Sequence, residues 1–169
     1  MKQAALSISP TGTRARLAIV ADALQSYAER GVFRGFSQDI RNTKAIFRLL
    51  WHRDRVFELV FAPQQNTLRF AQVLPNVATE MYQDLQEFIN ARCTSELPEH
   101  RRIDPNKVQI LSARRGGNVS LTAQVLDGDD EYAARKLIHL VHEIFLTFLM
   151  EGEYYEYMVE NFDLDPDRM

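Results

Sequence analysis

Residues 118–126, Asn-Val-Ser-Leu-Thr-Ala-Gln-Val-Leu, alternate between apolar and polar side chains more regularly than any other stretch of the chain. Val119, Leu121, Ala123 and Val125 fall on one side of an extended strand, and Ser120, Thr122 and Gln124 fall on the other. This period of two is typical of an antiparallel strand that has one face on a core and one face toward solvent. We therefore expect a sheet with one covered and one open face.

Four further segments carry strand patterns, and they cover residues 44–51, 56–62, 67–73 and 107–113. Pro63-Gln64-Gln65-Asn66 separates two of them. Proline presets a turn dihedral and asparagine tolerates a left-handed one, so this tetrad predicts a hairpin. Arg114-Arg115-Gly116-Gly117 predicts a second hairpin turn, which leads into residues 118–126.

Helical spacing of apolar residues defines the remaining elements. Stripes with intervals of three and four predict helices over residues 13–30, 77–92 and 131–150, and a short helix over 153–162. Gly31 ends the first of these helices. Residues 94–105 hold two prolines and five charged residues and are expected to form the longest loop.

The predicted order is α-β-β-β-α-β-β-α plus a short C-terminal helix. Segregated antiparallel strands with helices on one side form a two-layer α+β fold. The 169 residues fit one domain, with residues 1–12 and 163–169 expected to be flexible.

Composition narrows the function classes. The only cysteine, Cys93, cannot form an internal disulfide, and the N-terminus lacks the apolar core of a secretory signal, so we expect a cytoplasmic protein. No apolar run is long enough for a membrane span. Residues 1–55 hold ten Lys/Arg against four Asp/Glu, and residues 151–169 hold one against seven. Because the isoelectric point is about 5.8 and the basic residues are scattered among apolar ones, nucleic acid is not an expected partner.

Several polar groups have both a chemical and a structural interpretation. His139, His142 and Glu143 have helical spacing but match no zinc motif, so no metal ligand is predicted. Arg114 and Arg115 beside two glycines suit a phosphate-contacting tip or a plain turn. The acids at 127–131 fit helix capping better than calcium binding. Cys93 has no base beside it, and no catalytic residue or cofactor is predicted.

The open sheet face is the candidate partner surface. It should carry Arg48, Glu58, Val60, Arg69, Ala71, Ser120 and Thr122, a mixture of charged and small side chains. Trp51, near Arg53 and Arg55, fits either a recognition anchor or a position at the core edge. From this set we predict that Arg48, Trp51, Glu58, Arg69 and Thr122 contact a partner.

Residues 14–150 resemble two groups of known proteins. Their element order resembles type III secretion chaperones, and the sequence within it resembles the YbjN-type family of bacterial sensory transduction regulators. The resemblance rests on Leu68-Arg69-Phe70 through Pro75, on Phe88-Ile89-Asn90, and on the 118–127 strand that leads into a long apolar helix. It implies a homodimeric, nonenzymatic protein that binds other proteins, with a surface that holds an extended polypeptide.

The expected function is therefore a nonenzymatic protein-interaction module, chaperone-like or regulatory, that binds a protein or peptide partner by strand or helix pairing. The alternative is a sensor domain that responds to a small molecule or nucleotide through Arg114, Arg115 and the neighbouring glycines.

Overall fold

The computed structural model describes residues 10–94 and 96–162. The predicted flexible segments 1–9 and 163–169 lie outside the described residues, whereas residues 10–12 belong to the first helix. The principal elements are α2 (Pro10–Glu29), β1 (Gly35–Ile40), β2 (Ala45–Trp51), β3 (Arg55–Ala62), β4 (Thr67–Leu74), α3 (Thr79–Ala91), β5 (Val108–Arg115), β6 (Asn118–Val125), α4 (Asp130–Glu143) and α5 (Tyr155–Asn161). A π-helix, η4 (Ile144–Met150), continues α4.

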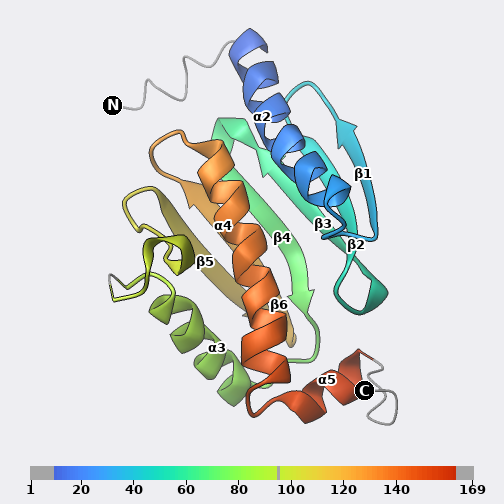
Figure 1. Ribbon diagram of the computed structural model, residues 1–169, viewed down its shortest axis with the longest axis vertical. Coiled ribbons are helices and arrows are strands. Elements are labelled where there is room, and N and C mark those ends of the chain that lie inside the picture. The colour runs from blue at the N-terminus through green and yellow to red at the C-terminus, as the bar shows by residue number, and fades with distance from the viewer. Residues whose placement is uncertain (1–9, 95, 163–169) are drawn as a thin grey trace.

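The α+β class is confirmed. Six antiparallel strands form one sheet in the order β1-β2-β3-β4-β6-β5. Helices α2, α3 and α4 lie over one face of this sheet, and α5 lies at its end beyond η4 (Figure 1). The predicted division into a covered and an open face is thus what the described residues show.

The predicted order of elements was wrong at one point, because it lacks β1. No strand was predicted between the first helix and residues 44–51, yet Gly35–Ile40 pairs with β2 along its whole length. Ser37, Gln38 and Ile40 are exposed, so this edge strand shows no apolar alternation. Its structure depends on backbone hydrogen bonds to β2, which side-chain patterning does not reveal.

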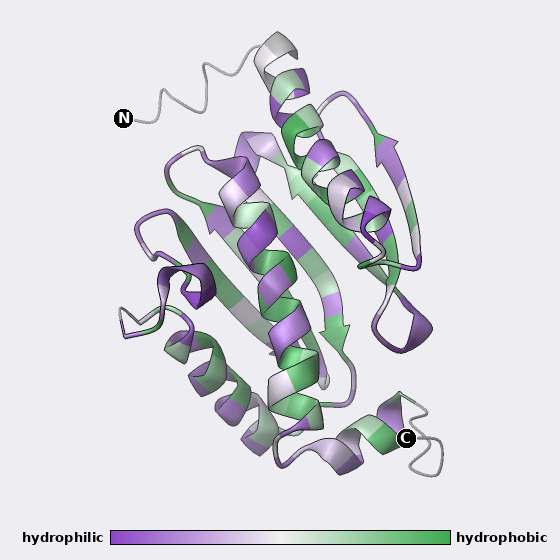
Figure 2. Ribbon diagram, viewed as in Figure 1, coloured by the Kyte–Doolittle hydropathy of each residue, from purple (hydrophilic) through white to green (hydrophobic). Residues whose placement is uncertain are grey.

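The core lies between the sheet and the helices. Phe47, Phe61 and Phe70 from the covered face of the sheet are completely buried, as are Leu24 of α2 and Leu137 of α4. Hydrophobic and hydrophilic residues alternate along α3 and α4, as expected of helices with one face on a core (Figure 2). The apolar stripes that predicted these helices are the buried stripes.

Two predicted turns have the backbone geometry that their residues favour. Asn66 adopts a left-handed conformation with φ 58° and closes the β3–β4 hairpin. Gly31 has φ 80° at the end of α2, where the Val32 N–H donates to the carbonyl oxygen of Tyr27. This arrangement is the glycine C-cap that ends many helices.

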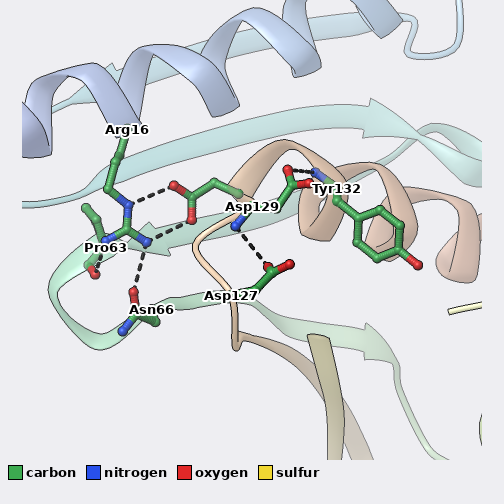
Figure 3. A network of polar contacts seen from close by, with 7 residues as sticks. Arg16, Pro63, Asn66, Asp127, Asp129 and Tyr132 are labelled. Atoms are coloured by element: carbon green, nitrogen blue, oxygen red, sulfur yellow. Dashed lines mark hydrogen bonds and ion pairs between the residues drawn. The ribbon is translucent and has the colours of Figure 1, made fainter. Parts of the chain in front are cut away.

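A polar network joins α2 to the start of α4 (Figure 3). The Arg16 guanidinium donates to both carboxylate oxygens of Asp130, to the carbonyl oxygen of Pro63 at 3.0 Å, and to Oδ1 of Asn66 at 2.9 Å. The Asp130 side chain is only 1% exposed. Because every polar group here has a partner, we assign this network a structural role.

Candidate functional site

The uncovered face of the sheet carries a row of side chains that spans five strands. Strand register aligns Ile46 of β2, Val60 of β3, Arg69 of β4, Thr122 of β6 and Leu111 of β5. Their neighbours in each strand point into the core, because successive strand residues face opposite sides. We call this set the central row.

The central row combines an unpaired charge with apolar flanks. Arg69 is exposed, and its guanidinium forms no ion pair with any residue in the described part of the chain. Ile46 and Val60 are half-buried on one side of it, and Leu111 is 45% exposed on the other. Val56 of β3, also on the uncovered face, is 64% exposed. Apolar side chains on both sides of a free cation suit an amphipathic ligand.

The next row of the same face holds a cross-strand ion pair. Arg48 Nη2 lies 3.1 Å from Glu58 Oε2, and the two residues are directly opposite each other on β2 and β3. Both side chains are about half exposed. An exposed pair of this kind contributes little to stability, so its charges are free to exchange with those of a partner.

Four of the five predicted contact residues thus share one face, namely Arg48, Glu58, Arg69 and Thr122. Trp51 does not join them, because it is 6% exposed and packs on the covered side against Phe33 and Phe57. Two positions were predicted for Trp51, a recognition anchor and the edge of the core, and the structure places it at the edge of the core. The alternation of side chains along this strand predicts the same position, since Trp51 lies on the same side as the buried Phe47 and Leu49.

The predicted open face included Val60 and Ala71 but lacked its other apolar side chains. Ile46, Leu50, Val56 and Leu111 all face the uncovered side by register and were not predicted to lie there. The signal was present for two of them, because Ile46 and Leu50 alternate with core residues within one predicted strand. A segment such as 45–51, in which Arg48 is the only polar residue, obscures this alternation, since both of its faces are largely hydrophobic.

A pair of histidines lies beside the core instead of on the uncovered face. His52 is sandwiched between Trp51 and Phe145, each at a ring-centroid distance of 4.4 Å. The His142 ring is 5.4 Å away, and Arg34, Arg53 and Asp54 line the same cavity. Burial, and to a smaller extent His142, lowers the pKa of His52 to about 3. His52 is therefore neutral at physiological pH.

The residues considered for metal binding do not converge. Among residues 10–94 and 96–162, no group of three or more His, Cys, Asp or Glu side chains is placed to hold a metal ion. Asp129 caps α4 by accepting from the Tyr132 N–H at 3.1 Å, as predicted, and Lys107 donates to Asp127 at 2.7 Å. The acids at the start of α4 are thus held by capping and ion pairing.

The two arginines beside the glycine-rich turn point to opposite sides of the sheet. Arg114 Nε donates to the carbonyl oxygen of Val77 on the helix side at 2.6 Å, while Arg115, the next residue along β5, faces the other way. Gly116 and Gly117 have positive φ and form the hairpin turn. The geometry is that of a turn in which one arginine anchors the start of α3.

Cys93 and the short C-terminal helix α5 also take structural positions. Cys93 is half-buried at the end of α3, and burial raises the pKa of its thiol, which disfavours the reactive thiolate. Tyr157 and Met158 of α5 are buried, and the Tyr157 hydroxyl donates to the carbonyl oxygen of Pro75. The tyrosine-rich helix therefore packs on the domain.

The fold and the uncovered face together define a single-sheet α+β domain with an open surface of mixed polarity. Comparisons with family models, with curated proteins and with solved structures found no significant match. None of the helices described here combines the length and the apolar character needed to cross a membrane.

Proposed function

We propose that this chain is a nonenzymatic protein-interaction module of the cytoplasm that binds an extended or amphipathic segment of a protein partner on the uncovered face of its sheet. The observation that carries the proposal is the central row, in which the unpaired Arg69 has Val60 and then Ile46 on one side, and Thr122 and then Leu111 on the other. A matching ligand presents a carboxylate to Arg69 and apolar side chains to Ile46 and Val60 on one side and Leu111 on the other.

A partner can gain free energy of binding on this face, because apolar side chains are already exposed there before the partner binds. Leu111 and Val56 are exposed in the free protein, so a partner that covers them gains the transfer free energy of apolar surface, about 25 cal/mol per Å². Covering Arg69 with a carboxylate replaces solvent by a charge-assisted hydrogen bond and adds selectivity.

The resemblance described above supports the same proposal, since secretion chaperones hold an extended polypeptide on a similar surface. Strand β1 departs from the element order on which that resemblance was drawn. A chaperone-like or regulatory role and a homodimeric state belong to the proposal, and light scattering tests the dimer as a mass twice that of the 19.6 kDa chain.

Capture from a native lysate with two matched variants tests the surface. Leu111→Asp places a charge at the uncovered face, and Ile19→Asp places the same charge on α2 at nearly equal exposure, 45% against 46%. We expect the wild type and Ile19→Asp to retain the same partner, and Leu111→Asp and Arg69→Glu to lose it. Equal retention by all four proteins would show that the partner binds elsewhere.

A further inference from the structure

A small basic cavity lies on the helix side of the molecule, away from the uncovered face. It is formed by the end of α3, the loop around residues 99–103 and the C-terminal half of α4, and its volume is about 100 Å³. Its charged lining consists of Arg92, Arg101, Lys136 and Glu143, with His100, His139 and His142 around them. These groups come from three separate segments of the chain.

Positive charge is in excess within this cavity. The single carboxylate, Glu143, is shared by two guanidiniums, with Arg92 Nη1 at 2.6 Å from Oε1 and Arg101 Nη2 at 3.5 Å from Oε2. Lys136 has no carboxylate partner in the described residues and is 7% exposed. Three cations therefore face one anion.

Several hydrogen-bonding groups in the cavity are unused. The Lys136 ammonium donates to the carbonyl oxygens of Glu99 and His100, each at 3.3 Å, which leaves one of its three N–H groups. Arg92 Nε and His142 Nδ1 are buried and have no partner among the described residues. Buried polar groups in native proteins are nearly always hydrogen-bonded, and both residues line the cavity, so its wall has unused hydrogen-bonding capacity.

The local electrostatics agree with this requirement. Burial lowers the pKa of Lys136, and Arg135 and Arg102 lower it further, while Glu99 opposes them. Burial also lowers the pKa of His139, followed by Lys136, His142 and Arg135, with Glu143 acting in the opposite direction. Burial disfavours a charge of either sign, whereas the coulombic contributions of the neighbouring cations reflect a positive potential that favours an anion.

We propose that this cavity binds a phosphate group, held by Arg92, Arg101 and Lys136 in partial exchange for the carboxylate of Glu143. Its volume of about 100 Å³ is large enough for one tetrahedral oxyanion. Arginine forks and a lysine point charge are the usual partners of phosphate in proteins. The group is either free inorganic phosphate or the phosphate of a monoester whose remainder lies outside the cavity.

Titration calorimetry of the full chain with sodium phosphate, against sodium chloride of equal ionic strength, tests the proposal. We expect phosphate to bind with a dissociation constant of about 1 mM or tighter. Arg101→Gln should weaken binding about tenfold, because one charge-assisted hydrogen bond is lost. The matched control is Arg41→Gln, because Arg41 is also an exposed, ion-paired arginine, with its side chain 59% exposed against 44% for Arg101, and it lies outside the cavity.

A gain-of-binding variant keeps the test independent of folding defects. Glu143→Gln removes the competing carboxylate, and we expect it to tighten phosphate binding about tenfold. Phenyl phosphate, measured in parallel, distinguishes the two sources, since tighter binding of either ligand identifies it. The absence of saturable phosphate binding in both the wild type and Glu143→Gln, or equal losses in Arg101→Gln and Arg41→Gln, would overturn the proposal.

Discussion

Arg16 and Asp130, 114 residues apart in the chain, are joined by two parallel charge-assisted hydrogen bonds of 2.7 and 2.8 Å. This bidentate pair connects α2 to the first residue of α4 above the β3–β4 turn (Figure 3). The same guanidinium also binds that turn through Pro63 and Asn66. One side chain thus sets the relative position of two helices and a hairpin.

Replacement of Arg16 is expected to be strongly destabilising. In Arg16→Met, the buried Asp130 carboxylate loses its counter-charge, and the loss of one partner of a buried pair costs about 3–5 kcal/mol in the free energy of unfolding. Urea unfolding measures this cost. Arg14→Met, at an exposed position on the same helix, should change stability by less than about 0.5 kcal/mol. Similar losses in both variants would contradict a special role for the pair.

The buried His52 predicts a loss of stability in mild acid. Its pKa is about 3 in the folded protein and 6.5 in the unfolded chain, so only the unfolded chain takes up a proton between these values. The contribution of His52 is therefore complete above pH 6.5 and falls progressively as the pH drops toward 3. By pH 5 the loss should be about 2 kcal/mol.

Urea unfolding at pH 7.5 and pH 5 checks this prediction. His52→Phe keeps an aromatic ring between Trp51 and Phe145 but cannot be protonated, so its stability should fall less than that of the wild type. His100→Gln, at an exposed site, should behave as the wild type does. If His52→Phe and the wild type lost the same free energy, the acid sensitivity would come from other groups.

Gly152 should tolerate no side chain. A Cβ atom at this position would overlap the carbonyl oxygen of Phe148 in η4, so the backbone must shift to accept alanine. We expect Gly152→Ala to lower the free energy of unfolding by about 1–3 kcal/mol, as overpacking does elsewhere. The neighbouring exposed Glu153→Ala is the control, and an unchanged stability of Gly152→Ala would show that this turn relaxes freely.

The Tyr157 hydroxyl should contribute to the docking of α5. Tyr157→Phe leaves the ring in place and removes the donor to the Pro75 carbonyl oxygen, at an expected cost of about 1 kcal/mol. Tyr155→Phe lies two residues away on the same helix and should be close to neutral, because its hydroxyl has no hydrogen-bond partner among residues 10–94 and 96–162. Equal effects in thermal unfolding would argue against the hydrogen bond.

The predictable part of the fold was the part in which side chains alternate between core and solvent. Strand β3 buries every second residue from Phe57 onward, and β4 and β6 do so over most of their length, so their sequences carry the period of two. The exceptions are Ser120 of β6, which is buried although it was expected on the open face, and the end of β4, where Val73 and Leu74 are both buried. Strand β1 has no such requirement, because it lies at the edge of the sheet. Its pairing with β2 depends on backbone groups, which are the same for every sequence.

The candidate surface was predictable within strands but not between distant segments. Alternation alone placed Arg48, Glu58, Arg69 and Thr122 on one face, and the sheet order then aligned Arg69 with Thr122. The basic cavity joins Arg92 and Glu143, 51 residues apart, from the ends of two helices. No local sequence pattern predicts this contact, because it depends on how the two helices pack against each other.

The strand order also has a consequence for how the chain folds. Apart from β4 and β6, neighbouring strands in the sheet are consecutive in sequence. Strands β1–β4 and strands β5–β6 are therefore two antiparallel units that local hairpins can build. Only the β4–β6 pairing must close a loop, which contains α3 and β5, and such non-local contacts are slow to form. We expect the formation of the β4–β6 pairing to set the folding rate, with an intermediate in which the first four strands are already paired.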